Sequence, residues 1–182
     1  MSVIKFCNRC GAPVKKGIPP GDTLQRHICE NCNHIQYENP RLIVGCLPFW
    51  EDNRVLLCRR AIEPRYGLWT LPCGFMENGE DIEEGARRET AEEANARVDI
   101  LNLHTVFSLP RLNQVHFIFL ARLQDTNFSP GEESIETLLF TRDNIPWQEI
   151  AFSSTRFALE NFFDENRNEG AVHLGSGERL GP

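Results

Sequence analysis

Three glutamates stand close together in the segment RRETAEEANA, residues 87–96. Glu89, Glu92 and Glu93 have the three- and four-residue spacing that brings side chains together on one face of a helix. Two carboxylates about 5 Å apart, at an effective dielectric constant near 20, repel each other by roughly 3 kcal/mol. Some positive charge must offset this repulsion, and hard oxygen ligands on a rigid element are what Mg²⁺ or Mn²⁺ prefers. The spacing therefore predicts a divalent-metal site.

The helix that would carry these glutamates is marked at both ends. Asp81 and Glu84 have the spacing of a capping box, and Asn95 is a residue type that tolerates the left-handed backbone at which helices end. We therefore expect a helix from Ile82 to Ala94. On a helical projection of about 100° per residue, the glutamates share the sector of the small and apolar residues. They are expected to face the body of the protein.

Arg88 is the cation nearest to these carboxylates in the sequence. It stands four residues from Glu84 and four from Glu92, so we expect it to pair with both. This arrangement would leave Glu89 and Glu93 without a local partner, which is a second reason to expect a bound cation.

Four of the seven cysteines form two C-x-x-C pairs, CNRC and CENC. This spacing is typical of a zinc ribbon, in which two tight turns each supply two thiolates to one Zn²⁺. Two disulfides are the alternative, but no secretion signal is evident, and a redox-active pair would need a helix after its first cysteine. His34 could replace a ligand, although four cysteines would suffice. The predicted zinc ligands are Cys7, Cys10, Cys29 and Cys32.

Composition and charge narrow the classes of function. The chain has 182 residues, of which 41% are hydrophobic and 25% charged, which suits one globular domain with a small appendage. Its apolar runs are much shorter than the roughly 20 residues that span a bilayer, so we expect a cytoplasmic protein without a membrane segment. The net charge is −7; residues 1–40 hold five Lys/Arg and three Asp/Glu, giving +2, which leaves −9 for the remainder. This acidic body argues against general nucleic-acid binding.

The remaining patterns indicate an α/β fold. Alternation and β-branched or aromatic residues predict strands, Phe spacing predicts a carboxy-terminal helix packed on the sheet, and the glycine-rich end predicts a disordered tail. We expect a hairpin of residues 41–50 and 54–60, a short strand and ordered loop in 66–80, strands within 97–109, 115–123 and 136–145, a helix in 152–166, and the tail at 166–182.

The segment GFMENGEDIEEGARRETAEEANA, residues 74–96, resembles the Nudix box, G-x5-E-x7-R-E-U-x-E-E-x-G-U, where U is apolar. Three positions depart from the pattern: Thr90 replaces an aliphatic residue, Asn95 a glycine, and Cys73 the glycine that often precedes the box. The charged positions are intact. The matching residues are Gly74, Glu80, Arg88, Glu89, Glu92 and Glu93.

The resemblance implies a Nudix α/β/α sandwich around a mixed β-sheet at residues 38–165, preceded by a zinc ribbon at residues 1–37. It implies that Glu89 and Glu93 bind Mg²⁺ or Mn²⁺, that Glu92 ligates the ion or orients water, and that the backbone carbonyl of Cys73 completes the site. Arg88, paired with Glu80, would hold the helix. Family members often add a downstream glutamate; of Glu132, Glu133 and Glu136 we favour Glu136.

The resemblance also implies cleavage of a nucleoside diphosphate linked to another group. The ribbon resembles that of NADH pyrophosphatases, but their SQPWPFPxS segment is replaced here by SLPRLNQVHF from Ser108. Other segments resemble the zinc-ribbon hydrolases of FAD and ADP-ribose. We therefore favour hydrolysis of FAD or ADP-ribose with release of AMP by a homodimer, with Arg65 and Arg111 contacting phosphate. The alternatives are an NADH pyrophosphatase, or an RNA- or protein-binding module on a Nudix scaffold.

Overall fold

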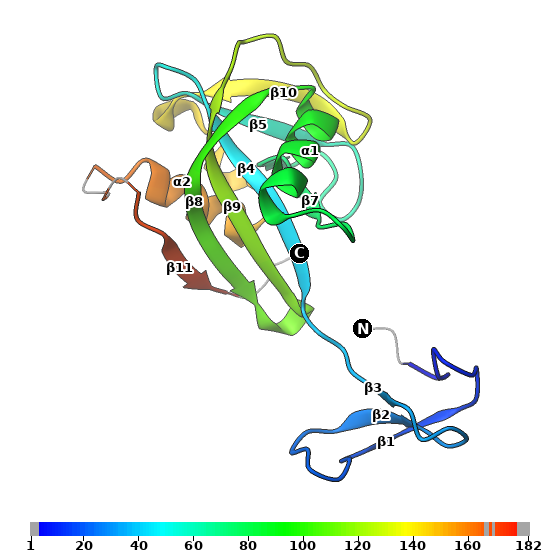
Figure 1. The fold of residues 1–182 in the computed structure, drawn as a ribbon. Helices are drawn as coiled ribbons and strands as arrows, with labels where there is room; N and C mark the ends of the chain where they lie inside the picture. The colour runs from blue at the N-terminus through cyan, green and yellow to red at the C-terminus, as the bar shows by residue number, and fades with distance from the viewer. Residues whose placement is uncertain (1–3, 166–167, 169, 178–182) are drawn as a thin grey trace. The chain divides into compact units, whose positions relative to one another are not determined.

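The structure is a computed structural model and describes residues 4–165, 168 and 170–177. The chain divides into two compact units, Met1–Pro40 and Arg41–Pro182 (Figure 1). In the described part of the chain, no helix has both the length and the apolar character needed to cross a membrane.

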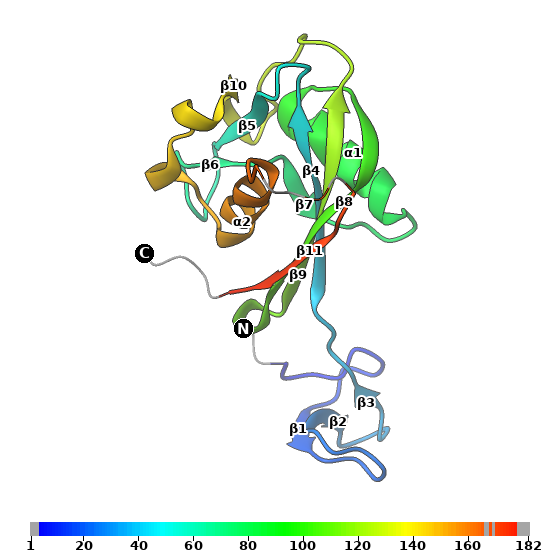
Figure 2. The same cartoon turned by 90° about the vertical axis from the view of Figure 1, so that its left-hand side faces the viewer.

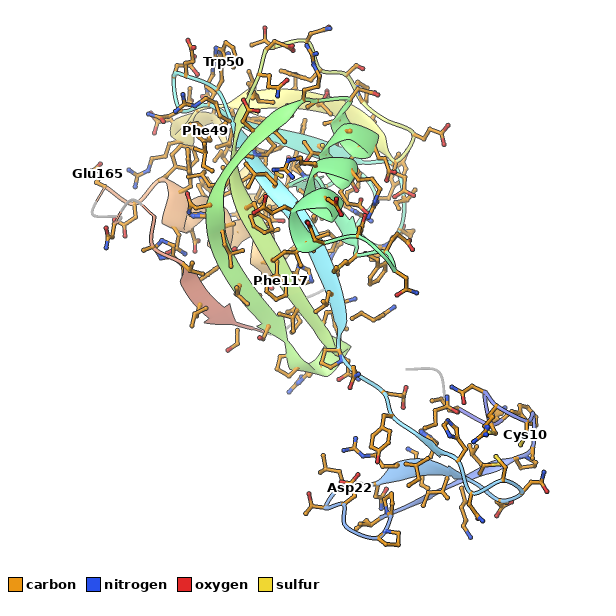
Figure 3. The ribbon with its side chains drawn as sticks, viewed as in Figure 1. Cys10, Asp22, Phe49, Trp50, Phe117 and Glu165 are labelled. Atoms are coloured by element: carbon orange, nitrogen blue, oxygen red, sulfur yellow. The ribbon has the colours of Figure 1, made fainter. Side chains whose placement is uncertain are left out.

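The first unit is a small three-stranded antiparallel sheet in the order β1-β2-β3. The four cysteine sulfur atoms lie together at one end of this unit; Cys10 is at this end and Asp22 at the other (Figure 3). The strands are β1 Val14–Gly17, β2 Arg26–Cys29 and β3 Ile35–Gln36.

The second unit is built on one eight-stranded mixed sheet in the order β10-β5-β4-β9-β8-β11, with β6 paired to β5 and β7 to β4. The β4–β9 and β8–β11 pairs are parallel and the others antiparallel, which confirms the predicted mixed sheet. The strands are β4 Arg41–Phe49, β5 Val55–Arg60, β6 Trp69–Thr70, β7 Cys73–Phe75, β8 Val98–Leu109, β9 Gln114–Leu123, β10 Ser134–Phe140 and β11 His173–Ser176.

Two helices cover opposite faces of this sheet, α1 Ile82–Ala94 and α2 Ser153–Phe162 (Figures 1 and 2). Alternation along β4 supplies both cores: Val44 packs in the cluster that includes residues of α1, and Leu47 in the cluster that includes residues of α2. The predicted α/β/α sandwich is confirmed. Short 3₁₀ helices lie at η1 Pro110–Leu112, η2 Arg142–Asn144 and η3 Trp147–Glu149.

Helix α1 begins and ends where the sequence predicts. The Asp81 carboxylate accepts hydrogen bonds from the backbone N–H groups of Glu83 and Glu84, and the Glu84 carboxylate accepts one from the N–H of Asp81. Asn95 ends the helix with φ 47°. Gly85 permits close packing, because a Cβ there would lie 2.8 Å from Val44 Cγ2.

The hairpin of β4 and β5 is also confirmed, but the two strands diverge at once. They pair at Phe49 and Val55; β4 then pairs with β7 over Ile43–Gly45, and β5 pairs with β6. The divergence places the backbone of β7 beside α1, within reach of its acidic side chains.

The described part of the tail differs from the prediction of disorder. β11, His173–Ser176, pairs in parallel with β8 from Thr105 to Ser108. The prediction is therefore wrong for this segment, because its order comes from a strand edge far away in the sequence. Residues 166–167, 169 and 178–182 lie outside the described part.

Candidate functional site

A cavity of about 830 Å³ in the second unit brings most of the predicted residues together. One part of its wall is charged, and the other is formed mainly by apolar side chains from β4, η1 and the start of α2. The charged part contains Glu89, Glu92, Glu93, Arg88, Glu133 and Arg60.

Glu93 is the most deeply buried carboxylate of the cavity, with 7% of its surface exposed. Its Oε2 accepts a hydrogen bond of 3.2 Å from the backbone N–H of Cys73 on β7. Burial, followed by repulsion from Glu89, raises the pKa of Glu93 to about 8, although the Cys73 N–H and Arg60 act in the opposite direction. The site therefore holds a carboxylate whose charge the protein compensates only in part.

Glu89 lies one helical turn away and is 9% exposed. Burial is the main cause that raises its pKa, opposed by a 2.7 Å hydrogen bond from Arg88 Nη1 to Glu89 Oε1. The expectation that Glu89 has no local partner is thus wrong. Gly74 leaves room for this carboxylate, because a Cβ at that position would displace it.

Arg88 contacts several of the carboxylates in the charged part of the wall. Its Nε and Nη2 donate to the two oxygens of Glu80 at 3.0 and 2.8 Å, which confirms that predicted pair, and Nη1 donates to Glu92 Oε2 at 3.0 Å. Its Nη2 also donates to the carbonyl of Phe75 at 3.1 Å, so it ties α1 to β7. The expected pair with Glu84 does not form, because that carboxylate caps the helix.

Glu136 does not line this cavity. It lies on β10, where its Oε1 accepts from Arg59 Nη1 at 3.0 Å. Glu132 and Glu133 line the cavity instead, and the charge of Glu133 raises the pKa of both Glu89 and Glu93. The structure therefore favours Glu133 over Glu136 as the additional glutamate of the site.

The loop before β10 brings Glu133 there by binding the end of α1. The N–H of Ser129 donates to the carbonyl of Ala94 at 3.0 Å, and the N–H of Gly131 donates to that of Glu93 at 3.0 Å. Gly131 is in contact with the helix backbone, since a Cβ there would collide with the carbonyl of Glu92. The loop and the helix are thus held as one piece.

The two arginines proposed to contact phosphate, Arg65 and Arg111, do not line the cavity, whereas Arg60 does. Its Nε donates to the carbonyl of Pro64 at 2.8 Å, and its guanidinium lies 5.1 Å from the ring centroid of Phe152. Strand alternation in LLCRR could have indicated Arg60, because successive residues of a strand point to opposite faces of the sheet and only one of the two arginines can face the cavity.

The four cysteines of the first unit form a cluster that fits zinc. Their sulfur atoms lie within 4.8 Å of one another, with separations of 3.8 Å for Cys7–Cys32 and 3.5 Å for Cys10–Cys29 and Cys10–Cys32. Tetrahedral Zn²⁺ with Zn–S bonds of about 2.3 Å requires sulfur atoms about 3.8 Å apart. Each pair also forms the same turn, because the N–H groups of Arg9 and Asn31 donate to the sulfur of the first cysteine.

The glutamates are less tightly grouped. Among the described residues, only the cysteines bring three or more candidate ligand atoms within 4.8 Å of one another. Mg²⁺ commonly uses one or two carboxylates and keeps several waters, so Glu89 and Glu93 beside the backbone of Cys73 fit such an ion without converging on it. The two buried, partly compensated carboxylates are the observation that favours a cation here.

Comparison with known proteins agrees with this geometry. Residues 39–158 match the NUDIX domain family, and residues 5–38 match the Nudix N-terminal zinc-ribbon family. The chain therefore belongs to the Nudix family of hydrolases, and the resemblance seen in the Nudix box is confirmed.

Individual relatives add detail. The chain is 30% identical over 165 residues to the NAD-capped RNA hydrolase NudC of Chromobacterium violaceum, covering 90% of this chain and 60% of that protein. It is 31% identical over 100 residues to an ADP-ribose pyrophosphatase of Methanocaldococcus jannaschii, covering 53% of this chain and 59% of that protein. A NUDIX hydrolase structure from Nitrosomonas europaea superposes with a TM-score of 0.91 at 51% identity, covering 97% of this chain and 100% of that one. The chain thus spans about 60% of the length of these two curated relatives.

Proposed function

We propose that this chain hydrolyses the diphosphate bond of a dinucleotide or nucleoside diphosphate derivative with the help of Mg²⁺ or Mn²⁺, and that FAD or ADP-ribose is its substrate and AMP a product. The observation that carries the proposal is the pair of buried carboxylates, Glu89 and Glu93, in the wall of a cavity of about 830 Å³. Alone, these negative charges would repel a diphosphate. They are therefore expected to bind a cation that also contacts the diphosphate.

The residues of the charged wall have different parts in this reaction. Glu89 and Glu93, with the carbonyl of Cys73, would hold the cation, and a divalent ion bound there would supply positive charge against the diphosphate and acidify water. Glu92, whose side chain is 59% exposed, orients water at the mouth of the site. Arg60 contacts a phosphate oxygen. Arg88 touches no substrate and is a positioning residue, because its guanidinium is occupied by Glu80, Glu89 and Glu92.

Glu133 is the additional carboxylate of the proposed mechanism. Its loop is fixed to the end of α1, and its charge acts on both Glu89 and Glu93. Whether Glu133 or Glu92 accepts the proton of the attacking water is decided by comparing the two glutamine variants. The variant whose pH–rate profile loses its acidic limb identifies the base.

The relatives support diphosphate chemistry and supply a second candidate. One is named an ADP-ribose pyrophosphatase, and another a NAD-capped RNA hydrolase of which this chain spans 60%. A human relative, 33% identical over 101 residues, is named a NAD(P)H pyrophosphatase; this chain covers 27% of it. NADH is therefore the second candidate substrate.

The test is release of AMP from FAD, ADP-ribose and NADH, followed by chromatography with Mg²⁺, with Mn²⁺ and with a chelator. We expect metal-dependent turnover of FAD or ADP-ribose that Glu93→Gln and Glu133→Gln lower at least a hundredfold. Glu136→Gln is the matched control, because its carboxylate lies outside the cavity. Equal turnover by Glu93→Gln and wild type would refute the proposal. Faster turnover of NADH than of FAD and ADP-ribose would make NADH the substrate instead.

The remaining assignments are part of the same proposal. The zinc ribbon would comprise residues 1–37 and bind one structural Zn²⁺ through its four cysteines, and the Nudix domain would comprise residues 38–165. Elemental analysis tests the zinc, with one ion per folded chain expected. The homodimer and the cytoplasmic location stay predictions, of which light scattering tests the first.

A further inference from the structure

His116 is a buried polar residue of the cavity that the proposed reaction does not use. It lies on β9, is 5% exposed and forms part of the cavity wall. Its Nε2 lies 3.5 Å from Gln114 Oε1, whereas its buried Nδ1 has no hydrogen-bond partner among the described residues. Burial lowers the pKa of His116 to about 4, so the ring is neutral at pH 7 and offers one donor and one acceptor.

The neighbour of Nε2 indicates which nitrogen carries the proton. An amide oxygen only accepts hydrogen bonds, so Nε2 donates to Gln114 Oε1 and Nδ1 is left as a bare acceptor. A buried acceptor without a donor costs free energy, and a ligand that supplies a donor recovers it. Phosphate oxygens at neutral pH are themselves acceptors. The partner of Nδ1 is therefore an N–H or O–H group.

The sheet register places His116 away from the carboxylates. Phe75, Ile43 and His116 are direct partners across β7, β4 and β9, so their side chains share one face of the sheet, and all three line the cavity. Glu93 accepts a hydrogen bond from the backbone N–H of Cys73, which lies two residues before Phe75. At about 4.8 Å between strands and 3.3 Å per residue, His116 lies about 10 Å across the sheet and about 7 Å along it from Cys73.

This separation suits a nucleoside that extends from a diphosphate held at Glu89 and Glu93. Around His116 the wall includes apolar residues, of which Ile43 is 9% exposed and Phe75 is 46% exposed. An apolar wall with one or two fixed polar groups is the usual form of a site that selects a ligand by its hydrogen-bonding edge.

We propose that His116 is a specificity-determining residue whose Nδ1 accepts a hydrogen bond from the nucleoside of the substrate, given either by the exocyclic amino group of adenine or by a ribose hydroxyl. This inference rests on the proposed function, which places the diphosphate at Glu89 and Glu93. Because Nδ1 lies below the surface of the cavity wall, the ring rotates about its Cβ–Cγ bond to meet the donor; the proton stays on Nε2, and the 3.5 Å contact of Nε2 with Gln114 is given up in the complex. That torsion has a broad energy profile.

The test compares ADP-ribose with two analogues, one carrying hypoxanthine in place of adenine and one lacking the 2′-hydroxyl of the adenosine ribose. The values of kcat/KM are measured for wild type, His116→Asn, His116→Gln and His116→Phe. The side-chain oxygen of asparagine can occupy the position of the histidine Nδ1, whereas that of glutamine lies nearer to the position of Nε2. We expect wild type and His116→Asn to lose about tenfold on one analogue, the loss expected for one hydrogen bond, and the other two variants to process all three substrates at one lower rate.

The analogue that is disfavoured identifies the donor. Wild type that does not discriminate against either analogue, or His116→Phe that keeps the wild-type discrimination, would overturn the inference. Calorimetric titration of AMP, IMP and 2′-deoxy-AMP in the presence of Mg²⁺ separates this failure from that of the proposed function, because binding of these mononucleotides needs no hydrolysis. If wild type and His116→Asn bind one of the two analogues more weakly than AMP, and His116→Phe binds all three equally, the inference is supported even in a protein that does not cleave ADP-ribose. Equal affinities of wild type for all three mononucleotides overturn it.

Discussion

Replacing Glu93 by glutamine should make the metal-free protein more stable at alkaline pH. The folded protein raises the pKa of Glu93 from 4.5 to about 8, so between these values the folded state binds a proton that the unfolded state has lost. Stability then falls as pH rises, because the folded state binds more protons than the unfolded one. The contribution is fully present below about pH 4.5 and is lost as pH rises through about 8.

The size of the effect follows from the same pKa values. At 1.36 kcal/mol per pH unit, the linkage amounts to about 3 kcal/mol of unfolding free energy between pH 5 and pH 8, as an upper limit. Glutamine keeps the shape of the side chain, and its oxygen can accept the hydrogen bond from Cys73. The variant should therefore lack this pH dependence and exceed wild type in stability at pH 8.

Urea unfolding at pH 5 and pH 8 of zinc-loaded protein dialysed free of Mg²⁺ and Mn²⁺ measures both quantities, with Glu136→Gln as the control that keeps the wild-type dependence. Added Mg²⁺ should stabilise wild type at pH 8 and have little effect on Glu93→Gln, because a ligand of the folded state stabilises by mass action. If Glu93→Gln and wild type lost the same free energy between the two pH values, the assignment of a buried, poorly compensated carboxylate to Glu93 would be wrong.

Three further predictions concern single residues, two in the second unit and one in the first. Gly74→Ala should lower kcat at least tenfold with the fold retained, because the new methyl group displaces the Glu89 carboxylate; wild-type kcat in steady-state kinetics would contradict this. Arg88→Lys should lower the urea midpoint, because an ammonium cannot donate in parallel to both oxygens of Glu80; an unchanged midpoint would show that the bidentate pair is dispensable. Cys10→Ser should reduce the zinc content below one ion per chain and expose the first unit to amide exchange, while exchange in residues 41–165 stays slow; full zinc occupancy would rule out Cys10 as a ligand.

Local chemistry explains why α1 and the cysteine cluster could be predicted. The limits of the helix depend on Asp81 and Asn95, which act within one turn, and the cysteine spacing encodes two turns that need no distant partner. The pair of Glu80 with Arg88 required the family resemblance, since the two residues are not neighbours on a helix. Four of the predicted acidic and basic residues consequently share one cavity: Arg88, Glu89, Glu92 and Glu93.

The points at which the structure differs from the expectations depend on long-range structure. The choice between Glu133 and Glu136 is decided by the irregular register between Ser134 and Glu136 and by the loop that binds the end of α1. The contact between Arg88 and Glu89 joins adjacent residues, which helix spacing alone does not bring together; the arginine reaches it because Glu80 and Phe75 hold its other nitrogens. β11 forms only because β8 offers it an edge.

Binding of Mn²⁺ to the zinc-loaded protein, followed by electron paramagnetic resonance, tests most directly whether the cavity is a divalent-metal site. Titration of wild type should remove the signal of free Mn²⁺, and Glu89→Gln and Glu93→Gln should each weaken this binding at least tenfold, whereas Glu136→Gln should not. Equal Mn²⁺ affinity in wild type and in both cavity variants would contradict the account.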